Sequence, residues 1–128
     1  CWGRNDYGQV GDGTTYTRLT PRSIITSGVA ELVTGGSFSC ARLTSDEMKC
    51  WGYNTYGQLG DGTTTNRTRP VTVQGLDAGI SQITAKSGHA CAVTGEGKGQ
   101  CWGRNQDGQL GNGTLVDSLV PDYITAGQ

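Results

Sequence analysis

One motif of 14 residues occurs three times in this chain of 128 residues. Its copies begin at Cys1, Cys50 and Cys101, at intervals of 49 and 51 residues. Each copy reads Cys-Trp-Gly-x-Asn-x-x-Gly-Gln-(Val/Leu)-Gly-(Asp/Asn)-Gly-Thr. Self-similarity at a period of roughly 20–50 residues is typical of repeat architectures. We therefore divide the chain into repeat units 1–49 and 50–100 and a partial unit, 101–128.

Each repeat unit carries the signals of four short β-strands. Short segments bounded by glycine or proline indicate strands, and no segment keeps an apolar period of 3.6 residues. The glycine-rich half of the motif predicts a loop, because its small residues allow tight turns. Proline lacks a ladder donor, so Pro21, Pro70 and Pro121 should each open a strand or lie on a sheet edge. The predicted strands are 22–25, 29–33, 38–43, 71–74, 80–85, 89–94 and 122–125, together with the Cys-Trp segments.

This pattern predicts an all-β protein of about two and a half four-stranded units. A four-stranded sheet of roughly 50 residues cannot bury both faces alone, whereas stacked sheets bury them against their neighbours. The predicted architecture is a set of β-propeller blades, within a closed propeller or an open stack. Trp2, Trp51 and Trp102 occupy equivalent positions, and we expect them to pack between adjacent blades.

The repeated residues also carry a family resemblance. The motif, then a proline, then a segment with His89, Cys91 and Ala92, resembles the regulator of chromosome condensation repeat over the whole chain. The resemblance implies a β-propeller, usually seven-bladed, in which the sequence repeat is offset from the structural blade. It also implies guanine-nucleotide exchange as one candidate activity. The repeats differ from each other at three positions of this pattern. Phe38 stands where the next unit has His89. Two further differences are Asp46 in place of Gly97 and Arg42 in place of Val93.

The pattern further predicts that these residues are a segment of a longer repeat protein. The strand at Cys1 lacks the strand ten residues upstream that would pair with it, and the third unit stops at Gln128 before its last two strands. Seven such units would need roughly 350 residues. We expect further repeats of the same chain, or neighbouring copies, to complete the open sheet edges.

Four of the five cysteines are spaced identically. Cys40–Cys50 and Cys91–Cys101 are each ten residues apart with a hairpin turn midway, so each pair should lie opposite on adjacent strands and form a disulfide. Cys1 is left without a partner. Zinc binding and buried reduced thiols remain alternatives. Two disulfides would indicate an oxidising compartment, so we expect a secreted or cell-surface protein.

The composition disfavours several kinds of partner and chemistry. Charged residues make up 16% of the chain and the net charge is −1, so nucleic acid is not expected, and no apolar run is long enough for membrane insertion. His89 could be a general base, but it stands alone and its counterpart is Phe38. Asp12 and Asp61 hint at calcium, yet the third copy has Asn112. We predict no catalytic residue, no metal and no cofactor.

Recognition is expected where the repeats differ while keeping their length. Loops displayed on a rigid scaffold often carry binding, and Tyr and Arg are frequent hot spots. The alternative is that these are ordinary solvated loops. The candidate binding residues are Tyr7, Tyr16, Arg18, Tyr56, Asn66, Arg67, Asp107 and Asp117. The N-glycosylation acceptor pattern occurs at Asn66 and Asn112.

The sequence supports three functions of different classes. The first is a non-enzymatic, secreted or cell-surface binding or scaffold module, whose loops recognise a protein or a glycan. The second is a structural protein that assembles into an oligomer or fibre through open blade edges. The third is the nucleotide exchange that the family resemblance implies. Exchange would need a complete propeller and an intracellular setting, whereas paired cysteines point outside the cell.

Overall fold

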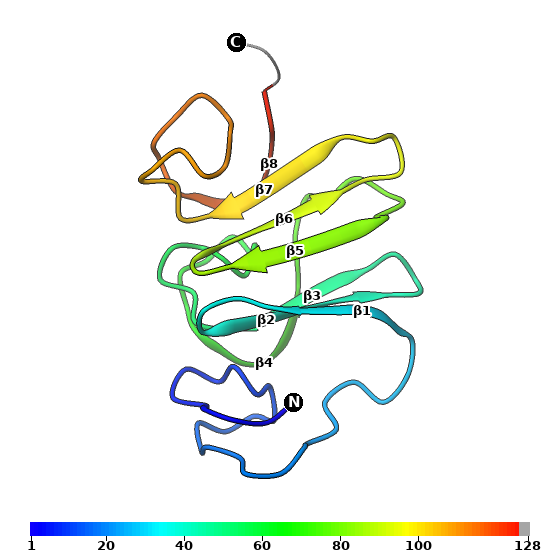
Figure 1. Cartoon of the computed structure of the whole chain (residues 1–128), viewed down its shortest axis with the longest axis vertical. Helices are drawn as coiled ribbons and strands as arrows, with labels where there is room; N and C mark the ends of the chain where they lie inside the picture. Colours follow the sequence, from blue (N-terminus) through cyan, green and yellow to red (C-terminus); the bar gives the residue numbers. More distant parts are fainter. Residues whose placement is uncertain (126–128) are drawn as a thin grey trace.

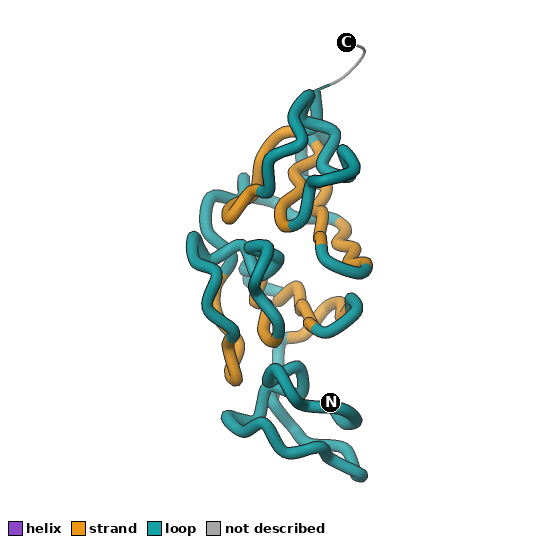
Figure 2. The backbone as a smooth tube through the Cα atoms, turned by 90° about the vertical axis from the view of Figure 1, so that its left-hand side faces the viewer, coloured by secondary structure: helices purple, strands orange, loops and turns teal. Residues whose placement is uncertain are grey.

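The computed structural model describes residues 1–125. Its strands form two four-stranded antiparallel sheets, with strand orders β1-β2-β3-β4 and β5-β6-β7-β8. Figure 1 shows the sheets following one another along the long axis of the molecule, with the N-terminal segment beyond the first sheet, and Figure 2 shows the same succession from the side. The all-β prediction is confirmed. The strands are β1 (Val29–Thr34), β2 (Phe38–Leu43), β3 (Met48–Gly52), β4 (Arg67–Thr72), β5 (Gln82–Lys86), β6 (His89–Val93), β7 (Gly99–Gly103) and β8 (Ser118–Tyr123).

The sheets are offset from the sequence repeats. The first two strands of each sheet come from the end of one predicted repeat unit. The third strand, which carries the Cys-Trp pair, crosses the unit boundary, and the fourth strand lies in the next unit. The two sheets are therefore built from residues 29–72 and 82–123. Over the described residues, no helix is long and apolar enough to cross a membrane.

Most predicted strands exist, but two expectations about the proline segments are wrong. Residues 22–25 form no strand, and the Cys-Trp segment before them makes a single bridge, between Gly3 and Arg18. In both sheets the equivalent Cys-Trp strand is held by a further strand on its other side, β2 or β6, and among residues 1–125 no strand does this for Gly3. Cys1 and Arg22 nevertheless exchange two backbone hydrogen bonds, at 2.7 and 2.8 Å, so the pairing of Cys50 with Val71 and of Cys101 with Asp122 has a counterpart here.

Pro70 and Pro121 lie inside β4 and β8 and do not open these strands. Both strands are at sheet edges, as the alternative expectation required. The register also shifts opposite Trp51 and opposite Trp102, so that each proline sits in a bulge where no ladder donor is needed.

Two of the three tryptophans pack between neighbouring repeats as predicted. The side chains of Trp51 and Trp102 are buried. Their Nε1 groups donate hydrogen bonds to the backbone carbonyls of Gln9 and Gln58, each at 3.0 Å, in the loop of the preceding motif. Trp2 is the exception, because 66% of its surface is exposed. No earlier motif within residues 1–125 supplies a loop to cover it, so its packing between blades stays a prediction.

The cysteine pairing predicted from spacing agrees with the structure. Cys40 and Cys50 are directly opposed on β2 and β3 and form a disulfide, and Cys91 and Cys101 do the same on β6 and β7. In each pair the Cα atoms are 4.1 Å apart, close to the separation of a non-hydrogen-bonded cross-strand pair. Cys1 is free and partly exposed.

Candidate functional site

The three motif loops lie on one side of the stack, together with the β1–β2 and β5–β6 turns. We call this side the loop face. It consists of loops 4–17, 53–66 and 104–117 and turns 35–37 and 87–88, and it is at the left of Figure 1. The turns 44–47 and 94–98 lie at the opposite ends of the strands, on the side that we call the hairpin face.

A buried asparagine holds each loop in shape. The side-chain nitrogen of Asn54 donates to the carbonyl oxygens of Thr63 and Thr65, at 3.0 and 2.9 Å, and its Oδ1 accepts from the backbone N–H of Leu59 at 3.0 Å. Asn5 and Asn105 make the same set of bonds in their own loops, and all three asparagines are fully buried. The loop face is therefore a rigid surface, as recognition loops on a scaffold should be.

Glycine within the Gly-Gln-Leu-Gly segment permits the tryptophan contact. Gly60 has φ of 67°, a conformation that favours glycine. A Cβ atom there would lie 2.8 Å from Nε1 of Trp102, too close for a real contact. The motif thus couples the loop of one repeat to the tryptophan of the next.

The acidic residue of the first two loops is occupied by internal partners. Asp12 accepts hydrogen bonds from the hydroxyl and the N–H of Thr14, and it forms an ion pair with Arg18. The hydrogen bonds from Thr14 and the pairing with Arg18 together lower the pKa of Asp12 to about 2, outweighing the opposing effect of burial. Asp61 has the same arrangement with Thr63 and Arg67. Residues 1–125 contain no group of three or more His, Cys, Asp or Glu side chains that could hold a metal ion.

Four of the candidate binding residues support the loops from within. Arg18 and Arg67 pair with the aspartates just described. Asn66 and Asp117 each accept a hydrogen bond through Oδ1, from the backbone N–H of Asn54 and Asn105 at 2.9 and 2.8 Å. Their residue types vary between repeats, but Asn and Asp supply the same acceptor. Their contact with a partner stays a prediction.

The other four candidate binding residues differ in exposure: Tyr16 and Asp107 are exposed, whereas Tyr7 and Tyr56 are half-buried. Tyr16 is 71% exposed, with the Arg18 guanidinium 5.9 Å from its ring centroid. Asp107 is exposed and lies 3.6 Å from Nη2 of Arg104. Tyr7 and Tyr56 belong to a continuous row of side chains on the loop face.

Three half-buried tyrosines and one arginine run across the junctions between repeats. The ring centroids of Tyr7 and Tyr53 are 4.6 Å apart, and those of Tyr53 and Tyr56 are 6.2 Å apart. The guanidinium carbon of Arg104 lies 5.6 Å from the centroid of Tyr56. We call these four side chains the aromatic row. Tyr53 and Arg104 were missed by the sequence reasoning, although both occupy the variable x of Cys-Trp-Gly-x-Asn, where the first repeat has Arg4.

A cleft opens beside the aromatic row, between the two sheets. Its volume is about 210 Å³, and the hairpin turns Gly36-Ser37 and Ser87-Gly88 border it. Ser87 has φ of 40°, one of two non-glycine residues in 1–125 with positive φ. Within the described part of the chain, Arg104 is the only charged residue that lines the cleft.

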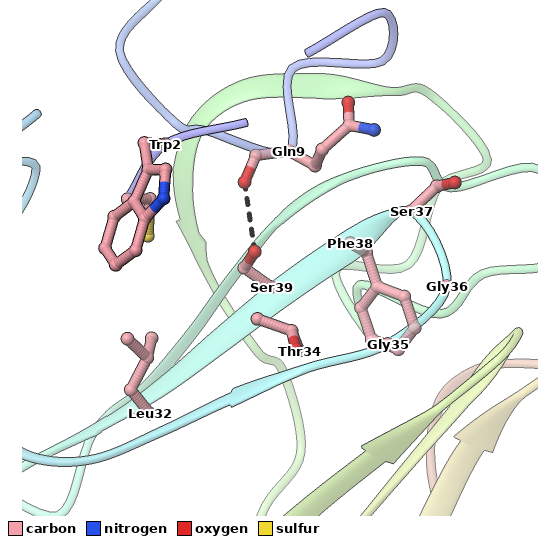
Figure 3. A pocket seen from close by; sticks show the side chains of 10 residues that line it. Trp2, Gln9, Leu32, Thr34, Gly35, Gly36, Ser37, Phe38 and Ser39 are labelled. Atoms are coloured by element: carbon pink, nitrogen blue, oxygen red, sulfur yellow. Dashed lines mark hydrogen bonds between the residues drawn. The ribbon is translucent and has the colours of Figure 1, made fainter. Parts of the chain in front are cut away.

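A second, larger cavity lies between the N-terminal segment and the first sheet. Figure 3 shows Trp2 and Leu32 on one side of it and Phe38 further along β2, with the hydroxyl of Ser39 donating to the carbonyl of Gln9 at 3.0 Å. Its volume is about 350 Å³. Among residues 1–125, no acidic or basic side chain lines it, and Trp2, Leu32 and Phe38 give it apolar walls.

His89 does not form part of a catalytic arrangement in the described structure. It is half-buried, and burial lowers its pKa, with a further lowering from nearby Lys86. Its ring makes no hydrogen bond within residues 1–125 that would orient it as a general base.

Comparison with known proteins identifies the repeat. Residues 1–42, 50–93 and 101–128 match the family described as Regulator of chromosome condensation (RCC1) repeat. The chain belongs to the RCC1 repeat family. A second description of the same repeat matches residues 29–58 and 80–109, ranges that begin with β1 and just before β5 and so follow the structural blades more closely.

The RCC1 relatives are much longer than this chain. It is 38% identical over 130 residues to the ultraviolet-B receptor UVR8 of Arabidopsis thaliana, covering 98% of this chain and 30% of the receptor. It is 36% identical over 129 residues to the E3 ubiquitin-protein ligase HERC2 of Homo sapiens, covering 98% of this chain and 3% of the ligase. The chain therefore spans less than a third of these relatives.

Solved structures agree on the fold. Human WBSCR16 superposes with a TM-score of 0.83 at 28% identity, over 97% of this chain and 34% of that one. Prp20p of Saccharomyces cerevisiae gives a TM-score of 0.78 at 19% identity, over 97% and 33% of the two chains. The RCC1 repeats of this chain are thus blades of the β-propeller type, a module of the kind that binds proteins.

Proposed function

We propose that this chain is a non-enzymatic, extracellular protein-binding module that recognises its partner through the loop face. The observation that carries the proposal is the aromatic row. Tyr7, Tyr53, Tyr56 and Arg104 come from three motif loops and form one continuous surface on a rigid scaffold. Tyrosine and arginine are enriched among the residues that contribute most to protein interfaces.

The rigidity of the loops favours recognition by this surface. The buried asparagines and the tryptophan contacts fix the loops before any partner arrives, so little conformational entropy is lost on binding. RCC1-type propellers also bind proteins elsewhere: Prp20p was studied for its binding to Gsp1p and histones, and was crystallised with Kap60. A protein partner is the better proposal than a glycan for this reason.

The extracellular setting rests on the disulfides. Both pairs join neighbouring strands, and structural disulfides persist in oxidising compartments. Peptide mapping under non-reducing conditions, on protein purified from its source with thiols blocked at lysis, should recover Cys40 linked to Cys50 and Cys91 linked to Cys101. Recovery of all four as blocked free thiols would contradict the extracellular proposal.

Binding is tested by capture with a matched pair of variants. Tyr53→Ser removes the central ring of the aromatic row, whereas Glu96→Gln changes an exposed residue of the hairpin face. Proteins from the extracellular fraction of the source should be captured by the wild type and by Glu96→Gln, and lost with Tyr53→Ser. The captured protein is then purified and its affinity measured by calorimetry, with a weakening of about tenfold or more expected for Tyr53→Ser. Equal affinity of all three proteins would contradict recognition by the loop face.

Assembly through open edges is a second candidate, favoured by the apolar surface beside the N-terminal segment. Trp2 is 66% exposed and Leu32 is 52% exposed on the wall of the larger cavity. Analytical ultracentrifugation over a range of concentrations tests it: concentration-dependent association that Leu32→Asp abolishes supports assembly, and a monomer at all concentrations contradicts it.

A further inference from the structure

The first and third motif copies place an arginine at the same position but pair it differently. In the first copy, Nε of Arg4 donates to the carboxylate of Asp6 at 2.7 Å. In the third copy, the residue equivalent to Asp6 is Gln106, which carries no charge. Asp107 reaches Arg104 only through Nη2, at 3.6 Å, and its own side chain is 75% exposed. The carboxylate that satisfies Arg4 therefore has no counterpart at Arg104.

The consequence is an orphaned donor. Within residues 1–125, Nε of Arg104 is the one buried side-chain nitrogen or oxygen that has no hydrogen-bond partner. Native structures satisfy nearly all such groups, so an exception calls for a physical reason. Leaving a buried donor of a charged group without an acceptor costs stability, and a ligand that supplied the acceptor would recover that cost on binding.

The orphaned donor lies at a cleft that has other unusual features. Arg104 packs on the ring of Tyr56 beside Gly88, where an added Cβ would come within 3.3 Å of Cβ of Arg104. Across the turn, Ser87 holds a positive φ, a kind of backbone strain that clusters at functional sites. These features meet on the loop face, at the border of the aromatic row.

The charge of the cleft selects the kind of ligand. Arg104 is the one charged residue among those that line it, and no acidic residue does so. Lys86, the last residue of β5 and the neighbour of Ser87, adds a second positive charge nearby, and it is close enough to lower the pKa of His89. A planar guanidinium held by an aromatic ring matches a carboxylate, with which it can form two parallel hydrogen bonds.

We propose that the cleft at Arg104 binds an aspartate or glutamate side chain of the protein partner. The inference rests on the proposed recognition by the loop face and deepens it. The carboxylate accepts hydrogen bonds from the exposed end of the guanidinium and, after a side-chain rotation, from Nε, in the place that Asp6 takes at Arg4. The neighbouring tyrosine rings then cover the residues that flank the acidic side chain.

The experiment uses a random 12-residue peptide library displayed on phage, panned against the folded chain at low salt. Enriched peptides should share an aspartate or glutamate. A synthetic copy of the best peptide should lose about tenfold or more in affinity, by fluorescence anisotropy, when that residue becomes asparagine or glutamine. Arg104→Gln should weaken the original peptide by a similar factor.

Two further variants make the test specific. Lys98→Gln also removes one positive charge, but on the hairpin face, and should leave the affinity within about twofold. Gln106→Asp rebuilds the pairing of the first copy inside the third, so it should compete with the peptide and weaken binding while the thermal unfolding midpoint stays equal or rises. Gln106→Asp also keeps the test decisive if Arg104→Gln fails to fold.

The outcomes separate the two proposals. The carboxylate inference would be overturned if the enriched peptides lose affinity for Tyr53→Ser but share no acidic residue, or if Arg104→Gln leaves their affinity unchanged. Recognition by the loop face would still stand in either case. Peptides indifferent to both Tyr53→Ser and Arg104→Gln, or no enrichment at all, would overturn both.

Discussion

The molecule contains the same junction between repeats twice, and the two copies differ in an instructive way. The first junction joins residues 1–25 to the sheet β1–β4, and the second joins that sheet to β5–β8. In both, a tryptophan donates to a glutamine carbonyl of the preceding loop at 3.0 Å. At the second junction Ile83 is 6% exposed, whereas Leu32, which pairs with the equivalent alanine in the first sheet, is 52% exposed. The contact between loop and tryptophan is thus independent of whether the neighbouring sheet is present.

The same comparison separates scaffold from recognition. Both junctions share the buried asparagine, the glycine-rich loop and the tryptophan, because these residues make the contacts that hold repeats together. They differ on the loop face at the residue two positions after the tryptophan: the first has Tyr53, whose ring lies 4.6 Å from that of Tyr7, and the second has Arg104 with an orphaned Nε. Partner specificity should therefore depend on the second junction more than on the first.

The largest expected effect distinguishes the tryptophans. Trp102→Ala should lower the free energy of unfolding by about 3–5 kcal/mol, because it empties a fully enclosed site and leaves the carbonyl of Gln58 without its donor. Trp51→Ala should cost somewhat less, because its junction lacks the second sheet. Trp2→Ala should cost less than about 1 kcal/mol, as expected for an exposed side chain. Urea unfolding measures all three, and a cost for Trp2→Ala equal to that of Trp102→Ala would contradict the comparison.

A smaller difference is expected between the two aliphatic residues. Ile83→Ala should cost about 2–4 kcal/mol, whereas Leu32→Ala should cost less than about 1 kcal/mol, because only Ile83 is enclosed between two sheets. Both changes are measured by chemical unfolding under the same conditions. Equal costs would mean that the surface around Leu32 is covered in solution, and would favour the assembly function.

The disulfides should differ in accessibility. Cys40 and Cys50 are both fully buried, whereas Cys91 is partly exposed. Mild reduction of the folded chain should therefore open Cys91–Cys101 first. Each disulfide that is opened should lower the free energy of unfolding by somewhat under about 3 kcal/mol, because each closes only a short loop. Alkylation during reduction followed by peptide mapping gives the order. Simultaneous labelling of all four cysteines would show that global unfolding precedes both steps.

The smallest effect is expected in the loops at low pH. The folded pKa of Asp12 is about 2, below its ordinary value, so its contribution to stability is present above about pH 4 and is lost as the pH falls through 2. The third loop carries Asn112, which does not titrate. The amide resonance of Thr14 should therefore shift with an apparent pKa near 2, whereas that of Thr114, which donates to Asn112, should stay constant. Matching shifts at both amides would contradict this assignment.

Internal repetition made the fold predictable from sequence, and its limits explain what was missed. The spacing of Cys40 and Cys50 about a hairpin turn determines which residues face each other, so both the strand Phe38–Leu43 and the disulfide could be inferred. Residues 22–25 resembled the other proline segments locally, and Arg22 does pair with Cys1 through two backbone hydrogen bonds, but no regular strand continues from there. The burial of a motif tryptophan depends on the loop of the preceding motif, so the packing of Trp2 stays a prediction whereas that of Trp51 and Trp102 is visible in the structure.

The candidate site was less accessible to sequence reasoning. Asn66 and Asp117 differ in type yet perform one task, so variation between the repeats did not reveal that each accepts a hydrogen bond from the loop backbone. Tyr53 and Arg104 were overlooked because they occupy the variable position of the motif. The orphaned donor of Arg104 becomes visible only when its surroundings are known in three dimensions.

The most direct test of recognition by the loop face is hydrogen exchange of the chain alone and in complex with its captured partner. The account predicts slower amide exchange in residues 53–58, 87–88 and 104–107, and no change in the turns 44–47 and 94–98 of the hairpin face. Protection confined to those turns, with exchange in the loop face unchanged, would contradict it.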